Sequence, residues 1–243
     1  MSDRFVGSAA FVSHPGAVRT VNEDSYLDAS DIGVWCVADG MGGHEGGDIA
    51  SQMVVDGLSA LAPGPSIVEQ ASQRLAATNR ELRDLSAKRY GNQTIGATVA
   101  LFLADGPNGI CLWAGDSRIY LYRDGALRQL TRDHSQVEEL ISKGVLQRAE
   151  AKDHPLAHVI TRAVGADDDL RLETCQEPLR DGDLVLLCSD GLNDAVPEVE
   201  IGDLLGEGNG DCAHIAAELL NLALECHARD NVTVGVIRFR VAD

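Results

Sequence analysis

The sequence predicts an α+β fold, a sandwich of largely antiparallel β-sheets flanked by helices. Two observations favour this class. Two helical segments follow each other directly in the first half of the chain, and most strand-like runs come after them. This grouping lacks the regular strand–helix alternation of a doubly wound parallel sheet. In addition, no low-complexity segment, charge block or Pro/Ser-rich linker divides the 243 residues, so we expect a single domain over residues 1–243.

Apolar runs rich in Val, Ile, Leu and aromatic residues predict the strands. In chain order they cover residues 33–38, 96–104, 109–114, 119–123, 170–176, 184–188 and 232–241. Helical periodicity covers residues 48–61, 66–88 and 212–227. Asp124-Gly125, between IYLYR and ALRQL, is typical of a tight hairpin turn. Residues 135–165 are more weakly patterned and contain Pro155, so we expect this flap segment to leave the sheets beside a site.

The composition excludes several kinds of partner. A formal net charge of −18 argues against a nucleic-acid surface, because such surfaces neutralise phosphates with Lys and Arg. No stretch approaches the ~18 uninterrupted apolar residues of a membrane span, and the N-terminus lacks a basic region followed by an apolar one. We therefore expect a cytoplasmic monomer that binds neither nucleic acid nor membrane. The six cysteines form no C-x-x-C pair, which favours reduced, mostly buried thiols.

Five aspartates stand at the ends of predicted strands. VWCVAD ends at Asp39, CLWAGD at Asp116 and LVLLCSD at Asp190, while Asp24 and Asp230 flank strand starts. In antiparallel sheets the end of one strand lies beside the start of its neighbour. All five carboxylates can therefore gather at one end of the sandwich.

Asp-Gly pairs are usually turns, and this chain has six of them. We interpret the pairs at residues 56, 105, 124 and 181 as turns. Asp39 and Asp190 differ because each ends a run that should be buried, where a carboxylate needs a compensating partner. Lys and Arg are scarce nearby, so divalent cations are the expected partner. Oxygen-only ligation favours Mg²⁺ or Mn²⁺ over Zn²⁺.

The segment DGMGGHEGG, residues 39–47, opens a helix and could cradle phosphate. It contains neither a Walker GxxxxGK[ST] nor a GxGxxG pattern. With Asp39 leading it, the loop is better suited to bringing the Gly40 carbonyl close to a metal. Arg19 is the candidate for binding substrate phosphate, because a guanidinium fork matches phosphate oxygens.

Six short strings occur in a specific order and spacing: RTVNED at 19–24, ADGMGGH at 38–44, GATVA at 96–100, GDSR at 115–118, SDGL at 189–192 and RDNVTV at 229–234. Together they resemble the metal-dependent protein phosphatase family, the protein phosphatase 2C type, over residues 7–240. The resemblance implies the α-β-β-α arrangement of that family, in agreement with the sandwich predicted above.

The resemblance also implies a set of metal ligands around Asp39, which would bridge two cations. The other implied ligands are Asp190 and Asp230 on one cation, Asp24, the Gly40 carbonyl and, through water, Glu23 on the other, and Asp116 with Asp190 on a third.

Further residues match the family by position. Arg19 corresponds to its phosphate-binding arginine, His44 to the histidine proposed as general acid, and Asn231 neighbours the metal ligands. Residues 135–165 correspond to its flap. This chain departs from many bacterial members at His158 in LAHVITRAVG, where they carry Asn. The change affects flap contacts and substrate preference but not the chemistry.

The function implied is hydrolysis of phosphoserine and phosphothreonine in proteins by a metal-bridging water, with two or three Mn²⁺ or Mg²⁺ ions, in opposition to a Ser/Thr kinase. Two alternatives remain: a catalytically silent phosphoprotein-binding module of the same fold, and a stress-response phosphatase with a dedicated regulatory partner. A cysteine phosphatase is excluded because no C-x5-R occurs. The string DGDLV at 181–185 matches an aspartyl-phosphate motif but precedes its strand, which puts its carboxylates at the wrong end.

Overall fold

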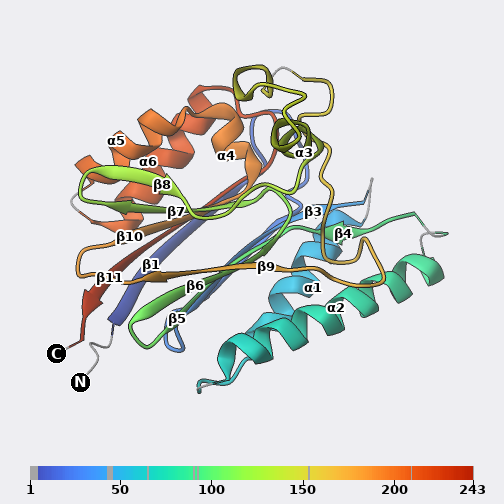
Figure 1. Ribbon diagram of the computed structural model, residues 1–243, viewed down its shortest axis with the longest axis horizontal. Coiled ribbons are helices and arrows are strands. Elements are labelled where there is room, and N and C mark those ends of the chain that lie inside the picture. Colours follow the sequence, from blue (N-terminus) through green and yellow to red (C-terminus); the bar gives the residue numbers. More distant parts are fainter. Residues whose placement is uncertain are drawn as a thin grey trace.

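Two antiparallel sheets face each other, and helices cover the outer face of each (Figure 1). The structure is a computed structural model that describes residues 5–42, 46–64, 66–89, 91, 93–152, 154–208 and 210–242. One sheet has the strand order β1-β11-β10-β7-β8, and the other β2-β3-β5-β6-β9 with β4 paired to β3. The predicted α+β sandwich is confirmed.

The bounds of the elements are as follows. The strands are β1 (Phe5–His14), β2 (Asp24–Ala29), β3 (Val34–Met41), β4 (Gly96–Ala97), β5 (Val99–Asp105), β6 (Asn108–Ala114), β7 (Arg118–Arg123), β8 (Ala126–Gln129), β9 (Glu173–Pro178), β10 (Leu184–Cys188) and β11 (Val232–Val241). The helices are α1 (Gly47–Ser59), α2 (Ile67–Arg89), α3 (Gln136–Ser142), the 3-10 helix η1 (Arg148–Glu150), α4 (Asp190–Ala195), α5 (Glu198–Glu207) and α6 (Cys212–Glu225).

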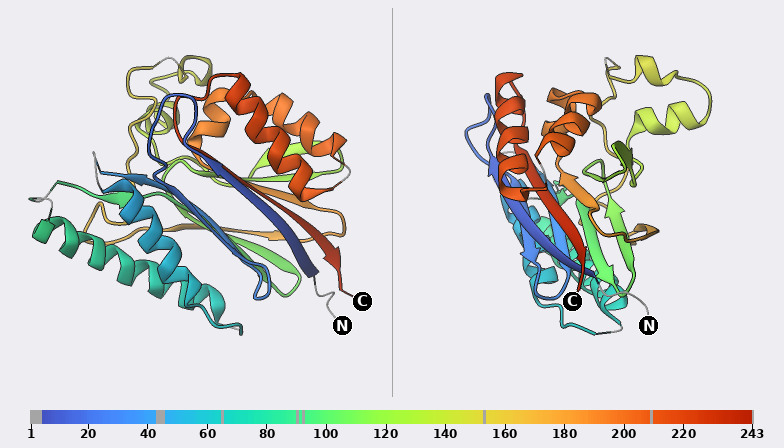
Figure 2. Two further views of the ribbon diagram at one scale, coloured as in Figure 1. Left: turned by 180° about the vertical axis from the view of Figure 1, so that it is seen from behind. Right: turned by 90° about the vertical axis from the view of Figure 1, so that its left-hand side faces the viewer.

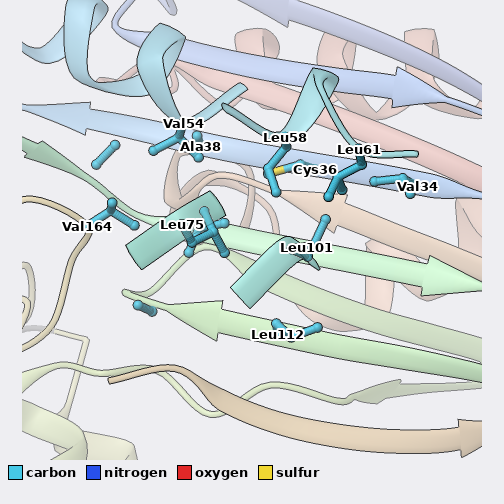
Figure 3. Packing of buried hydrophobic residues seen from close by; sticks show 14 of the residues in the cluster. Val34, Cys36, Ala38, Val54, Leu58, Leu61, Leu75, Leu101, Leu112 and Val164 are labelled. Carbon is cyan, nitrogen blue, oxygen red and sulfur yellow. The ribbon is translucent and has the colours of Figure 1, made fainter. Parts of the chain in front are cut away.

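Strand β3 shows why the central strands have unbroken apolar runs in the sequence. Val34 and Cys36 pack against the layer formed by α1 and α2, which Figure 3 shows, whereas Trp35 and Val37 pack between the two sheets. Both faces of the strand are therefore buried. A strand covered on both faces loses the alternation of polar and apolar residues that marks a half-exposed strand.

The outer helices form two further cores, one on each sheet. Helices α1 and α2 cover the sheet of β3, and α4, α5 and α6 cover the sheet of β10 and β11 (Figures 1 and 2). Leu58 and Leu75 are fully buried between the first pair of helices and their sheet (Figure 3). Within the described residues, no helix is long and apolar enough to cross a membrane.

One predicted turn is wrong. Asp56-Gly57 lies inside α1, whereas the other pairs assigned to turns, at residues 105, 124 and 181, do stand in turns. A Cβ atom on Gly57 would lie 2.6 Å from Thr78 Oγ1 of α2. The glycine thus permits the close crossing of two helices, and a sequence pattern alone does not separate that role from a turn.

The flap segment leaves the sheets as expected and stands away from the body at the end where α4 begins (Figure 2, right). It carries α3 and η1. Its two ends are joined by a bridge between Ser135 and Ile160 and by a hydrogen bond from the Thr161 N–H to the His134 carbonyl at 2.7 Å. All six cysteines are free, and four of them are buried.

Candidate metal centre

The five predicted aspartates gather at one end of the sandwich, and both sheets contribute. Asp24 of β2 lies directly opposite Asp39 of β3. Asp116 follows β6, Asp190 follows β10 as the first residue of α4, and Asp230 stands just before β11. The charges of the other four all raise the pKa of the Asp39 carboxyl, after the larger effect of its burial, so they act on it at short range.

Asp24 is the least exposed of these carboxylates, with 8% of its surface exposed. Its Oδ2 accepts hydrogen bonds from Ser189 Oγ and Thr233 Oγ1, both at 2.7 Å. Its Oδ1 is buried and has no hydrogen-bond partner among the described residues. Burial raises the pKa of Asp24 to about 6, although the two hydroxyls oppose that change.

Three other carboxyls of the cluster also have a raised pKa. Burial, followed by the nearest carboxylates, raises the pKa of Asp39 and Asp190 well above the ordinary range. Burial also raises the pKa of Asp116 to about 7. Asp190 Oδ1 is buried without a partner in the described part of the chain. Unpaired acceptors among mutually repelling carboxylates fit divalent cations, which would supply the missing positive charge.

A hydroxyl pair holds the Asp39 and Asp116 loops together. The Asp39 N–H donates to Thr98 Oγ1 at 2.9 Å, and the Thr98 N–H donates to the Asp39 carbonyl at 2.8 Å. Thr98 Oγ1 lies 2.7 Å from Ser117 Oγ, next to Asp116. Thr98 interrupts the run between β4 and β5, so the break in the strand places a polar group beside the carboxylates.

The glycines after Asp39 permit a close backbone approach. A Cβ atom on Gly40 would lie 1.9 Å from the Gly47 carbonyl oxygen, so only glycine fits where the end of β3 meets the start of α1. The Gly40 N–H donates to the Glu23 carbonyl at 3.1 Å. Burial raises the pKa of the Glu23 carboxyl, and a hydrogen bond from the Gly47 backbone opposes this change.

Arg19 reaches the cluster from the loop between β1 and β2. Its Nη2 lies 2.9 Å from Asp230 Oδ2, and 54% of its side chain is exposed. Asn231 fixes this loop, because its Oδ1 accepts from the Glu23 N–H at 2.8 Å and its Nδ2 donates to the Val21 carbonyl at 2.9 Å. The structure therefore places Arg19 at the open side of the carboxylates, and Asn231 acts on the loop that carries it.

Comparison with known proteins identifies the family. Residues 16–229 match protein phosphatase 2C. The chain belongs to the protein phosphatase 2C family. It is 32% identical over 239 residues to the serine/threonine phosphatase stp of Listeria monocytogenes serotype 4b (strain F2365), with 94% of each chain covered. It is also 36% identical over 227 residues to the serine/threonine protein phosphatase PstP of Mycobacterium tuberculosis (strain ATCC 25618 / H37Rv), covering 92% of this chain and 43% of that protein.

Solved structures of the family have the same fold as this chain. PppA, described as a key regulatory component of T6SS in Pseudomonas aeruginosa, superposes with a TM-score of 0.89 at 40% identity, covering 97% of this chain and 99% of that one. The catalytic domain of PstP in complex with two manganese ions gives a TM-score of 0.88 at 33% identity, covering 97% and 99%. This protein phosphatase 2C chain is thus a protein-serine/threonine phosphatase, and its family is metal-dependent.

Some groups of this protein phosphatase 2C site were not found from the sequence. Ser189 and Thr233 donate to Asp24, and Thr98 holds Asp39, yet none was a candidate. The signal available was adjacency, since Ser189 precedes Asp190 in SDGL and Thr233 follows soon after Asp230 in RDNVTV. His44, the predicted general acid, lies outside the described residues.

The rival motif at residues 181–185 proves structural. Asp183 has a side chain only 1% exposed, and its Oδ2 lies 2.6 Å from Arg123 Nη2. It also accepts a hydrogen bond from the Arg180 N–H at 2.7 Å. It precedes β10, at the opposite end of that strand from Asp190, as the sequence had indicated.

Proposed function

We propose that this phosphatase hydrolyses phosphoserine and phosphothreonine in proteins by the attack of a water shared between two cations that Asp39 bridges. The observation that carries the proposal is the convergence of five carboxylates from two sheets, with buried oxygens of Asp24 and Asp190 left without a partner among the described residues. Such a set is costly to bury unless cations bind it.

The ligand roles follow the predicted set. Asp190 and Asp230 would complete the site of one cation. Asp24 through its unpartnered Oδ1, the Gly40 carbonyl and, through water, Glu23 would serve the other. Asp116 with Asp190 would hold a third. All of these donors are oxygens, which favours Mn²⁺ or Mg²⁺, two or three for each chain.

The chemistry needs charge neutralisation and a nucleophile at neutral pH, because a phosphate monoester dianion repels hydroxide. When bound, the cations would supply both, lowering the pKa of a bound water to ~7 from 15.7. Arg19 would turn its exposed guanidinium fork from Asp230 to the phosphoryl oxygens and hold the substrate for in-line attack.

Two further roles belong to the same proposal. His44 would donate a proton to the leaving Ser or Thr oxygen, which is worth ~10²–10⁴ in rate for a general acid. The substrates would be phosphoproteins made by a Ser/Thr kinase, since that is the class of enzyme that forms these esters. The silent binding module is disfavoured by the complete set of carboxylates.

The test is hydrolysis of a phosphothreonine peptide by the purified chain. We expect activity with Mn²⁺, loss of activity with EDTA, and a fall of about 10²–10³-fold or more in the Asp39→Asn variant. Asp105→Asn, at the exposed last residue of β5, is the matched control and should keep full activity. Activity that persists in EDTA would refute the metal mechanism, and phosphopeptide binding without hydrolysis would favour the silent module.

A further inference from the structure

Two cysteines face each other on neighbouring strands of the sheet that contains β3. Cys111 of β6 and Cys175 of β9 are directly opposite in the antiparallel register, so both side chains point to the same face. That face is the core between the two sheets, where Cys111 is fully buried and Cys175 packs at the margin. Cys36 and Cys188 face other residue types across their neighbouring strands. Among the described strands, two thiols therefore meet only at this pair.

The spacing of the two strands fits a disulfide bond. Directly opposite residues of an antiparallel pair have Cα atoms roughly 4.5 or 5.5 Å apart. A disulfide bond spans Cα distances of roughly 4.4–6.8 Å, so both kinds of pair lie within its range. The thiols of Cys111 and Cys175 already form a hydrogen bond, which holds the two sulfurs together. The bond can therefore form without a change in the register of β6 and β9.

The two thiols differ in the way that a reactive pair requires. Cys175 is half-buried on β9, an edge strand of its sheet, so an oxidant can approach it from solvent. The hydrogen bond with Cys111 lowers the pKa of Cys175 by more than burial and the charge of Glu177 raise it. The same hydrogen bond, followed by burial, raises the pKa of Cys111. Cys175 is thus the sulfur that attacks an oxidant first, and Cys111 is the neighbour that can react with the product.

We propose that Cys111 and Cys175 are a site of reversible oxidation, at which hydrogen peroxide converts the two thiols into a disulfide bond between β6 and β9. The Cys175 sulfur bonds to one peroxide oxygen as the O–O bond breaks, and the released hydroxide takes up the proton that Cys175 had lost. The Cys111 sulfur then attacks the sulfenic acid, the S–S bond forms as the S–O bond breaks, and the second hydroxide leaves as water with the Cys111 proton. The peroxide gains the two electrons that the thiols lose, and an added thiol reverses the bond by exchange.

The bond would close a covalent loop that contains the whole flap segment. The chain between Cys111 and Cys175 carries β7, β8 and that segment. Glu173, two residues before Cys175, joins the two ends of the flap segment, because its Oε1 lies 2.9 Å from Arg162 Nη1 and 3.2 Å from His134 Nε2. The disulfide would fasten β9 and, with it, this contact. None of the clustered aspartates takes part, so the inference does not depend on the proposed phosphatase mechanism.

The experiment is peptide mapping of the full chain after treatment with hydrogen peroxide in EDTA. We expect one peptide pair joined through Cys111 and Cys175, which dithiothreitol separates again. In Cys111→Ala, Cys175 should stop at the sulfenic acid, which a dimedone probe labels, because no neighbouring thiol is left to react with it. Cys226→Ala, which removes an exposed cysteine outside the pair, is the matched control and should form the same disulfide. If the pair stays reduced while Cys226 is oxidised, the proposal is overturned.

Thermal unfolding measures whether the bond fastens β9. We expect the oxidised chain to melt about 5 °C or more above the reduced chain, because a disulfide that closes a long loop restricts the unfolded chain. Dithiothreitol should reverse this shift, and Cys175→Ala should show none. A disulfide that forms without raising the melting temperature would overturn the fastening of β9. Neither readout uses phosphatase activity, so this proposal and the proposed function can fail separately.

Discussion

Strand β10 has an aspartate near each end, and the two sit in opposite environments. Asp183, just before the strand, is almost fully buried and ion-paired with Arg123, which also pairs with Glu177. Asp190, just after it, has a buried oxygen with no protein partner among the described residues and several carboxylates as neighbours. Compensated charge holds the fold together, whereas uncompensated charge is available for binding an ion. An aspartate therefore has a different role at each end of β10, and the presence or absence of a positively charged partner determines that role.

The largest effect on stability should come from removing the charge of Asp183, at the compensated end of β10. Asp183→Asn leaves the Arg123 guanidinium facing only Glu177, and we expect a loss of about 3 kcal/mol in the free energy of unfolding, the low end for a broken buried pair. Urea denaturation measures this loss. Activity of the folded variant should match that of the unmodified chain. An unchanged unfolding midpoint would show that the Arg123 pair contributes nothing.

Adding metal should stabilise the other end by a similar amount. At a Mn²⁺ concentration 100 times the dissociation constant, a single site that binds only the folded state adds ~2.7 kcal/mol. Thermal unfolding with and without Mn²⁺ measures this gain, and EDTA should reverse it. Asp183→Asn should respond to Mn²⁺ as fully as the unmodified chain. A melting temperature that is the same with and without Mn²⁺ would contradict a metal centre between the sheets.

The same Asp→Asn change should have the opposite sign at the uncompensated end. Burial raises the pKa of Asp190, so its charge costs the folded state stability once the pH exceeds ~4, where an unfolded aspartate ionises. In EDTA at about pH 7.5 we expect Asp190→Asn to be more stable than the unmodified chain by ~1–2 kcal/mol.

A pH series of thermal melts in EDTA checks that sign. The metal-free unmodified chain should lose stability as the pH rises from ~4 through the values of about 6 and about 7 for Asp24 and Asp116. The advantage of Asp190→Asn should vanish below pH ~4, where both the folded and the unfolded state bind the proton. An Asn variant that is less stable in EDTA at about pH 7.5 would mean that Asp190 is compensated by the protein.

The smallest expected effect is on Mn²⁺ affinity, when the hydroxyl of Thr233 is removed. Thr233→Val removes one of the two donors to Asp24 Oδ2 with little change in shape. We expect a loss of about 1 kcal/mol in Mn²⁺ binding, or about fivefold in the dissociation constant, measured by calorimetry. Thr174→Val at an exposed position of β9 is the control. Unchanged Mn²⁺ affinity would place Thr233 outside the metal centre.

The fold could be predicted where buried strands appear in the sequence as continuous apolar runs. Strands β3, β5, β10 and β11 are apolar on both faces, so their runs were visible. Strands β1 and β2 were missed because they lie at sheet edges and are partly exposed, which dilutes the pattern. Short helices such as α4 were also missed, because six residues cannot display a helical period.

The candidate site likewise contains residues that the sequence predicts and residues that it does not. Its carboxylates were predictable because an aspartate that ends a buried run needs a partner. The hydroxyls of Ser189 and Thr233 were not, because Ser and Thr inside a strand look the same whether or not they bond a distant carboxylate. The His158–Asp194 contact likewise depends on how a loop returns to a helix 36 residues later, and no local pattern encodes that return.

The contribution of both sheets to the carboxylate cluster has a consequence for synthesis of the protein. Asp24 and Asp39 belong to the early part of the chain, whereas Asp190 and Asp230 belong to its late part, and β11 must insert between β1 and β10. A ribosome releases the chain from its N-terminal end, and such distant pairings form slowly. The nascent protein therefore cannot bring the five carboxylates together until β11 has emerged, and the proposed metal site forms only once both sheets have paired.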